Sequence, residues 1–259
     1  MDIEKAWLVC QEPVHIGGAE SDSRGNRNPV FRLSDRTPAI PGSSLRGALR
    51  EGAERNGNYE QFVKNWFGGK DEDISPGHIS LSWAWPLWWP VHVLGYGTWW
   101  VSCLSWLNRF QQLAQDAPIQ LDRSEVYITE PQLHNKNVYL RWLQLQNVQS
   151  CNVDLPAPEE VPSDRRIIVP SESVNTIVDM GLVRQPRVSL KAEADEQGNM
   201  VQNLFSVEGF PPKAVFFLHW TTRPQVENVS QWQTFLNGEH HLGGLWSVGY
   251  GRISITSIV

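Results

Sequence analysis

A long uncharged stretch near the middle of the chain constrains the fold most. No Asp, Glu, Lys or Arg occurs between Asp73 and Arg109, and seven of the thirteen tryptophans lie there. A membrane-spanning helix is one interpretation of such an apolar run. Pro86, Pro90 and two glycines interrupt it, however, and each proline inside a helix costs about 3 kcal/mol. The pattern therefore favours short buried strands joined by a turn.

Charge is distributed unevenly along the chain. The 259 residues carry a net charge of −6, which argues against a general cationic nucleic-acid binder. Between residues 24 and 50, however, six arginines are opposed only by Asp35, so this segment has a net charge of about +5 and the remainder about −11. A local basic arm on an acidic body can still hold phosphates.

Cysteine usage and the first residues bear on the compartment. Cys10, Cys103 and Cys151 lie far apart and form no C-x-x-C pair, so neither a disulfide framework nor a structural zinc site is expected. The opening MDIEKAWLVC has acids where a signal peptide needs a basic start. We therefore expect a cytoplasmic protein.

Strand and helix patterns are mixed without a regular repeat. Besides the Trp-rich strands of 74–107, strands are expected at 5–11, 126–129, 138–145, 166–169, 214–222 and 252–259. Helices are expected at 45–55, 105–114, 171–180 and 230–237. Residues 183–208 alternate apolar with polar around a polar tip, as a protruding hairpin does. Without a βαβα repeat, the pattern favours an α+β domain, an antiparallel sheet with helices on one face.

The connection after the first strand, residues 14–42, is long and polar. A loop of this length inside a compact domain is usually functional or mobile. It ends at the Pro-Gly pair 41–42, where Ser43 or Ser44 is expected to cap the next helix. Serine hydroxyls and free backbone N–H groups at a helix start favour an anion.

Two arginines follow that helix start. Arg46 and Arg50 are four residues apart, so both project from one helical face. With the serines they make a candidate phosphate grip. The plainer interpretation is an ordinary capped helix in which Arg50 pairs with Glu54.

A glycine-rich segment, HLGGLWSVGYGR, opens onto the final strand. Glycines allow backbone N–H groups to approach a ligand closely. The spacing is neither a Walker nor a Rossmann pattern, so a structural turn is the plainer interpretation and a ligand loop the alternative.

Several segments resemble the RAMP superfamily of type III CRISPR complexes. PAIPGSSLRGALR resembles the motif after the first strand, VHIGGAE the preceding His-Ile/Val-Gly element, and GGLWSVGYGR the glycine-rich loop. PGHISLSWAWPLWWPV with WVSCLSWLNRF, and PRVSLKAEADEQGNMVQNLFSVEGFPPKAVFF, are similar to the central segment and thumb hairpin of the repeated Cmr backbone subunit. The matches run in order from Val14 to Gly251.

The resemblance implies a ferredoxin-like (RRM-like) antiparallel core with large insertions. It implies one RAMP domain over 1–259, with a mobile loop at 14–42, a Trp-rich insertion at 74–107 and a thumb hairpin at 183–208. Such subunits would stack along a CRISPR guide RNA, with target RNA pairing to the guide in antiviral defence. The implied partners are guide RNA, target RNA and other effector subunits, copies of this chain among them, and no membrane.

The resemblance also implies which residues contact RNA. They come from the loop after the first strand, the helix start, the hairpin base and the glycine-rich segment. They are His15, Gly17, Gly18, Arg24, Arg27, Ser43, Ser44, Arg46, Arg50, Arg184, Arg187, Lys191, Gly243, Gly244, Gly249 and Gly251.

Catalysis does not carry over with the resemblance. In this branch an aspartate two residues before a proline cleaves target RNA, and here that position is Arg27. A guanidinium is neither a general base nor a metal-ligating carboxylate at pH 7. Asp22, with Glu20, is the nearby substitute, and Trp83 stands where relatives commonly have Asp. We expect weak or absent cleavage, with no cofactor unless an active site built on Asp22 uses Mg²⁺.

Two other classes remain open. Thirteen tryptophans and an acidic pI of about 5.7 suit a carbohydrate-binding protein that stacks sugars. A hydrolase with paired carboxylates, Glu125 and Glu130, is the other alternative.

Overall fold

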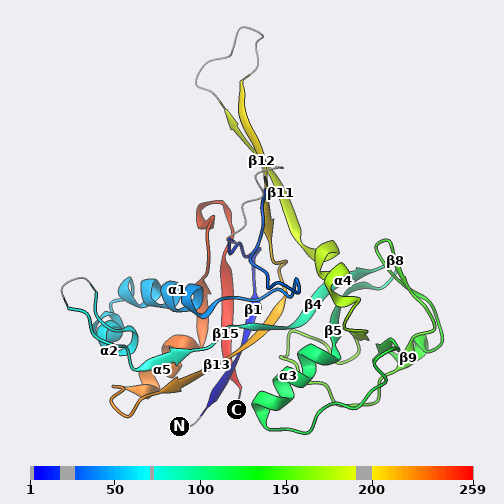
Figure 1. Cartoon of the computed structure of the whole chain (residues 1–259), viewed down its shortest axis with the longest axis horizontal. Coiled ribbons are helices and arrows are strands. Elements are labelled where there is room, and N and C mark those ends of the chain that lie inside the picture. Colours follow the sequence, from blue (N-terminus) through cyan, green and yellow to red (C-terminus); the bar gives the residue numbers. More distant parts are fainter. Residues whose placement is uncertain (1–2, 18–26, 71–72, 191–199, 259) are drawn as a thin grey trace.

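The computed structural model describes residues 3–17, 27–70, 73–190 and 200–258, and within them one 12-stranded sheet forms the centre of the protein. The main path through this sheet is β14-β15-β1-β13-β4-β5-β10-β6-β9, and β3, β7 and β8 attach beside it (Figure 1). Its strands are β1 (Glu4–Cys10), β3 (Ile79–Leu81), β4 (Trp85–Val93), β5 (Gly97–Cys103), β6 (Tyr127–Ile128), β7 (Val138–Leu140), β8 (Leu143–Leu145), β9 (Gln149–Ser150), β10 (Arg166–Val169), β13 (Val215–Thr222), β14 (Gly238–His241) and β15 (Arg252–Ile258). The mixed α+β architecture expected from the sequence is confirmed.

The three strands at the centre come from the two ends of the chain. β1 lies antiparallel between β13 and β15, with Leu8 opposite Phe216 on one side and Ile255 on the other. Successive side chains of a strand point to opposite faces, so Leu8 and Val9 enter two different apolar clusters. The sheet is therefore apolar on both faces and needs cover on both.

One face is covered by α1 (Gly42–Glu54), α2 (Val63–Phe67), α5 (Val229–Leu236) and the short η1 (Glu60–Phe62). Leu45, Leu49 and Ala53 are the buried residues of α1. Aromatic rings join the helices to each other, with Trp66 and Trp232 edge to face at 5.4 Å between centroids. Aromatic rings packed edge to face stabilise the fold beyond the contribution from burying their apolar area.

The opposite face is covered by α3 (Leu104–Ala114), so the expectation that helices lie on one face is wrong. Phe110 of α3 stacks on Trp7 at 4.7 Å and meets Phe217 edge to face at 5.3 Å. Trp7 and Phe217 lie on the side of β1 and β13 that α1 does not reach. Large apolar side chains on both faces of these strands require helices on both.

The Trp-rich stretch forms the antiparallel hairpin β4–β5, as expected, with His92 opposite Thr98. Gly95 (φ 82°) and Gly97 (φ 80°) lie at its turn in the left-handed region that favours glycine. Trp88 and Trp89 are completely buried. No helix in the described residues is long and apolar enough to cross a membrane.

The region between β5 and the end of α4 (Val174–Gly181) holds small strands and the short η2 (Pro131–Leu133). β10 pairs parallel with β5 and β6 pairs parallel with β9, so the sheet is mixed and not purely antiparallel. The long connection between β5 and β10 allows these two strands to pair in parallel, because parallel neighbours must be joined by a crossover.

A second, three-stranded sheet extends away from the first (Figure 1). β11 (Val183–Leu190) and β12 (Val201–Gly209) pair antiparallel, and β2 (Arg27–Asn28) pairs parallel with β12. The polar tip expected at 195–199 lies outside the described residues.

Candidate nucleic-acid interface

His15 lies where three distant segments of the chain meet. The main chain passes from β1 into bridges between Val14 and Phe210 and between His15 and Gly244. The His15 ring is buried, and its Nδ1 lies 2.7 Å from the carbonyl oxygen of Glu208. A carbonyl only accepts, so Nδ1 of His15 is the donor in this hydrogen bond. His15 thus joins the first loop to the glycine-rich loop and to the base of β12.

Two glycines of the glycine-rich loop are required by the fold. Gly243 has φ 82°, and a Cβ there would lie 2.1 Å from the carbonyl oxygen of His15. Gly251 has φ 98°, and its Cβ would lie 2.8 Å from the Leu242 carbonyl. Only glycine fits either position without moving the backbone. The structural turn that the sequence suggested is confirmed at these two residues.

The other two glycines, Gly244 and Gly249, are exposed on the same loop. Their amides already donate within the protein, from Gly244 to His15 at 3.0 Å and from Gly249 to Trp246 at 3.1 Å. The Gly251 amide likewise donates to Pro13 at 2.8 Å. A phosphate bound by these N–H groups would share or replace existing hydrogen bonds.

The start of α1 differs from the expected serine cap. The N-cap is Pro41, no side chain caps the helix, and Ser43 and Ser44 lie inside the first turn. The expected capping role of these serines is wrong, because proline fixes a backbone angle suited to the entry. Gly42 follows Pro41 and lies close to β3, so that a Cβ on it would be 3.1 Å from the Leu81 carbonyl oxygen.

The two arginines of α1 are occupied by protein groups. Arg46 donates to the carbonyl oxygen of Phe67 at the end of α2. Arg50 pairs with Glu54 at 2.8 Å, and Lys70 pairs with the same carboxylate at 2.7 Å. Lys70 and Arg50 together hold the pKa of Glu54 below its ordinary value. The plainer interpretation of Arg50, a pair with Glu54, is confirmed.

A groove of about 690 Å³ runs between α1 and the glycine-rich loop. Ser44 lines it from the helix, and Gly243 and Trp246 line it from the loop. The structure therefore brings the serine and glycine motifs to one groove. Arg46 and Arg50 do not line this groove and instead turn toward α2 and Lys70.

The base of β11 and β12 adjoins the same loop. Arg184 donates to the Glu208 carboxylate at 3.2 Å and to the Asp179 carbonyl at 3.0 Å. Burial raises the pKa of the Tyr250 hydroxyl, and the positive charge of nearby Arg187 partly opposes that rise. Arg184 and Arg187 therefore lie close to the segments that His15 joins.

Several expected contact residues lie outside the description. Gly18, Asp22, Arg24 and Lys191 fall in the undescribed segments. Gly17 is exposed and bridges Val30, which keeps the start of the loop against its middle. Arg27 is placed by its backbone alone, paired with Ser206 of β12.

Metal-ligating and carboxylate chemistry is sparse in the described part of the chain. No group of three or more His, Cys, Asp or Glu side chains that could hold a metal ion occurs there. Glu130, one of the candidate paired carboxylates, accepts from the Gln132 amide at 3.0 Å and so caps η2. Trp83 stacks with Trp85 at 6.0 Å and meets Phe31 at 5.6 Å.

Most tryptophans belong to the core and are unavailable for stacking on a ligand. Eight of the thirteen are buried, namely Trp66, Trp88, Trp89, Trp99, Trp100, Trp106, Trp220 and Trp232. Trp142 and Trp246 are the most exposed of the described tryptophans, at 80% and 71%. Trp246 was missed by reasoning from the sequence, although an aromatic residue between the glycines of a loop is a signal for base stacking.

The fold and this interface define an α+β protein with a central sheet, a glycine-rich loop beside its first strand and a projecting strand pair. The chain belongs to the RAMP superfamily, whose family model matches residues 7–254. No curated protein matched the sequence.

Solved structures with the same fold come from Cmr proteins. A type III-B Cmr-beta structure bound to cognate target RNA contains a chain with a TM-score of 0.80 and 15% identity, covering 99% of this chain and 97% of that one. An oligomeric Cmr4 from Pyrococcus furiosus has a TM-score of 0.72 and 19% identity, covering 100% and 98%. A further Cmr4 crystal structure has a TM-score of 0.71 and 19% identity, covering 99% of each chain.

Proposed function

We propose that this chain is a guide-RNA-binding backbone subunit of a type III CRISPR effector complex. One observation carries the proposal. Within a chain that matches the RAMP model over residues 7–254, His15 joins the first loop, the glycine-rich loop and the hairpin base at one place. A single sugar-phosphate strand could follow these three segments in succession.

The topology supports a ferredoxin-like core inside a single RAMP domain. β15, β1, β13 and β3 are neighbours in that order. In the chain, α1 lies between β1 and β3, and α5 between β13 and β15. That succession, βαββαβ with strand order 4-1-3-2, is the ferredoxin-like arrangement. On this proposal β11 and β12 form the thumb.

The residues proposed to hold RNA follow from the geometry. Arg184 and Arg187 at the hairpin base, Ser44 beside the groove and the exposed Trp246 supply charge, a hydroxyl and a stacking surface. Arg46 is exposed and adds positive charge on the α2 side. Arg50 contributes to the fold through Glu54 rather than to the RNA site.

The proposed partners are guide RNA, target RNA and other subunits. Support comes from the fold shared with a Cmr-beta structure solved with cognate target RNA and with an oligomeric Cmr4. A cytoplasmic location belongs to the same proposal, because Cys10, Cys103 and Cys151 are all free thiols.

Target cleavage is proposed to be weak or absent, since Arg27 occupies the position of the family's aspartate. The alternative is an endoribonuclease that uses Asp22 and Mg²⁺. Incubating the purified complex with labelled target RNA and Mg²⁺ separates them. Cleavage in the wild type that disappears in Asp22→Ala would establish the alternative.

RNA content tests the main proposal. The complex carrying Arg184→Ala with Arg187→Ala should copurify with at least about tenfold less RNA per subunit, because two phosphate-binding cations are removed. Sequencing the RNA bound to the wild type should return guide-like repeats. The matched control is Arg123→Ala with Arg223→Ala, two exposed arginines elsewhere. Undiminished RNA in the hairpin-base variant, with normal folding, would contradict the proposal.

A further inference from the structure

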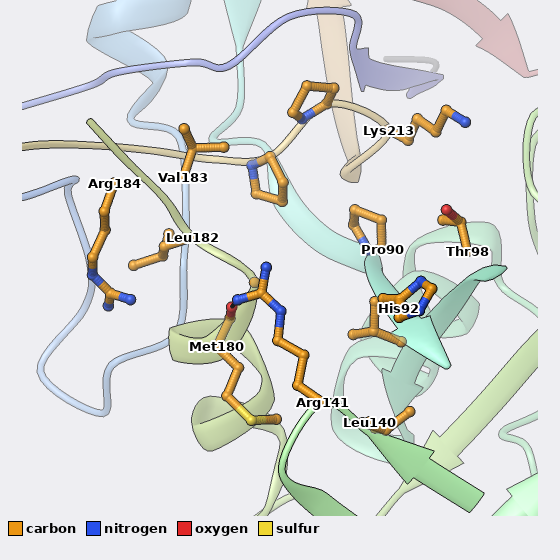
Figure 2. A pocket seen from close by; sticks show the side chains of 14 residues that line it. Pro90, His92, Thr98, Leu140, Arg141, Met180, Leu182, Val183, Arg184 and Lys213 are labelled. Carbon is orange, nitrogen blue, oxygen red and sulfur yellow. Dashed lines mark hydrogen bonds between the residues drawn. The ribbon is translucent and has the colours of Figure 1, made fainter. Parts of the chain in front are cut away.

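A second cavity, of about 640 Å³, lies at the root of the strand pair β11–β12 (Figure 2). Among the described residues, it shares no lining residue with the groove beside the glycine-rich loop. Figure 1 shows α1, which lines that groove, and α4, which ends at the cavity, on opposite sides of the hairpin base. The cavity volume lies within the range of about 300–1,000 Å³ that is usual for small-molecule sites. The cavity is therefore a separate site with room for a small ligand.

The lining of this cavity combines apolar walls with positive charge. Its apolar walls include the buried Pro90 and Pro211. Three exposed cations also line it, and no Asp or Glu of the described chain does; the cations are Arg141, Arg184 and Lys213. On a protein with a net charge of −6, such a lining selects an anion that has an apolar part.

Arg141 occupies a backbone position that does not favour arginine. Residues 141 and 142 alone join β7 to β8, with Leu140 opposite Leu143. Arg141 is the first of the two and has φ 50°. Two-residue hairpin loops favour asparagine, aspartate or glycine at such a left-handed position. The Arg141 guanidinium donates to the carbonyl oxygen of Met180 at 2.7 Å, and Figure 2 shows the side chain reaching toward Met180.

Lys213 occupies a similar backbone position. Residues 211–214 form a turn that is closed by a hydrogen bond of 3.2 Å from the Ala214 amide to the Pro211 carbonyl oxygen. Lys213 is the third residue of this turn and has φ 70°, where glycine or asparagine is favoured. Its amide donates to the Cys10 carbonyl at 2.6 Å, and its carbonyl accepts from the Trp100 indole at 3.0 Å. The surrounding fold therefore holds a lysine in an unfavourable conformation.

Two strained cations at one cavity indicate a ligand site. Backbone strain that the surrounding structure maintains is typical of binding sites. Arg184 is partly compensated by Glu208 at 3.2 Å, whereas Arg141 and Lys213 have no carboxylate partner among the described residues. Uncompensated cations suit phosphate oxygens, and apolar walls suit a flat ring. A nucleoside phosphate combines these two parts in one small molecule.

We propose that this cavity binds a free nucleoside phosphate, with its phosphates at Arg141 and Lys213 and its base against the proline walls. His92 and Thr98 line the same cavity and offer hydrogen-bonding groups to the ribose or the base. Trp142 is 80% exposed, and the Arg141 guanidinium lies 5.6 Å from its ring centroid, so it adds a stacking surface at the rim. This small-molecule site goes beyond the proposed RNA-binding function and does not rest on it.

Photoaffinity labelling of the purified full chain locates the site. Irradiation with azido-ATP should attach the probe to the segments that line the cavity, and excess ATP should prevent the labelling. These segments are 90–98, 140–142, 180–184 and 211–213. Labelling confined to other segments, or labelling that ATP does not reduce, would overturn the proposal.

Glycine substitutions separate binding from folding. Arg141→Gly with Lys213→Gly should weaken binding of N-methylanthraniloyl-ATP at least about tenfold, because both phosphate-binding cations are removed. The urea midpoint of unfolding should not fall, since glycine suits both turn positions. The control Arg123→Ala with Arg223→Ala changes two exposed arginines elsewhere and should bind the probe as the wild type does. Unchanged binding in the glycine variant, or a loss of binding that accompanies unfolding, would overturn the assignment.

Competition defines the chemistry of the ligand. Adenosine and inorganic phosphate should each displace the fluorescent probe at least about a hundredfold less effectively than ATP, because each carries only one part of the ligand. Displacement by inorganic phosphate as effective as that by ATP would show a site for anions without a base. That result would overturn the proposal.

RNA distinguishes a free nucleotide from a nucleotide within a strand. A single-stranded RNA oligonucleotide should displace the probe no better than ATP, and stronger displacement would place the cavity on the RNA path and refute the proposal. The variant Arg141→Gly with Lys213→Gly should copurify with as much RNA as the wild type. An equal loss of RNA and of nucleotide binding would likewise refute a separate site. The proposed function is tested by RNA content in the hairpin-base variant, so the two proposals fail on different measurements.

Discussion

Gly243 is a residue at which the backbone geometry leaves no alternative to glycine. Its φ of 82° lies in the left-handed region, and the position of a Cβ is blocked by the carbonyl oxygen of His15. The blocking atom is backbone, which cannot turn away as the end of a flexible side chain can. The contact between the first loop and the glycine-rich loop therefore depends on a missing side chain.

Gly243→Ala should lower the free energy of unfolding by about 3 kcal/mol, because left-handed strain and a main-chain clash add together. Gly47→Ala is the matched control: this glycine lies inside α1, and a Cβ there meets nothing within 4 Å. That change should stabilise the protein by about 0.5–1 kcal/mol. Urea unfolding measures both, and equal effects would contradict the assignment.

At the scale of elements, α4 holds the segment that follows β2. Arg32 and Arg36 both reach Asp179 of α4, at 2.7 Å and 2.5 Å. The Arg32 side chain is only 12% exposed, so its charge depends on this carboxylate. The pairing of β2 with β12 holds the other end of the same segment. The connection is thus fastened to the projecting sheet and to the helix beside it.

Asp179→Asn should lower the free energy of unfolding by about 2 kcal/mol, since it leaves a largely buried guanidinium without its counter-charge. Limited proteolysis should also cut residues 29–38 sooner. The exposed Asp116 offers the control Asp116→Asn, which should change neither quantity. An unchanged cleavage rate in Asp179→Asn would show that the ion pairs do not hold the segment.

At the scale of the whole molecule, the buried His240 and the half-buried His219 link stability to pH. Burial lowers the pKa of His240, whose Nε2 donates to the Leu236 carbonyl at 3.1 Å. Burial also lowers the pKa of His219 on β13. Both pKa values are below the ordinary 6.5 of the unfolded chain, so the unfolded state takes up protons first as the pH falls.

The stability contributed by these histidines should therefore be complete above pH 6.5 and decline as the pH falls toward the lowered values. Urea unfolding at pH 7.5 and 5.5 should show a loss in the wild type that is smaller in His219→Gln with His240→Gln. His134 is exposed, and His134→Gln should keep the wild-type dependence. A double variant as pH-sensitive as the wild type would contradict this account.

Local patterns in the sequence were enough for most elements. The proline and glycine interruptions in the Trp-rich stretch predicted the hairpin β4–β5, and apolar spacing predicted α1, α3, α4 and α5 within a few residues. β14 was missed, because GEHH has no alternating pattern and becomes a strand only by pairing with β15. The sequence also failed to predict that helices cover both faces of the sheet, because the alternation of Trp7 and Leu8 does not tell which helix covers which face.

The sequence by itself determined where charge, glycine and buried tryptophan occur along the chain, because these depend on residue type and local spacing. Only the tertiary structure decided their partners. It turned Arg46 to the carbonyl oxygen of Phe67, put Ser44 and Gly243 in one groove, and gathered Arg141, Arg184 and Lys213 around a cavity. Residues so distant in the chain meet only through strand order and packing, which local spacing does not encode.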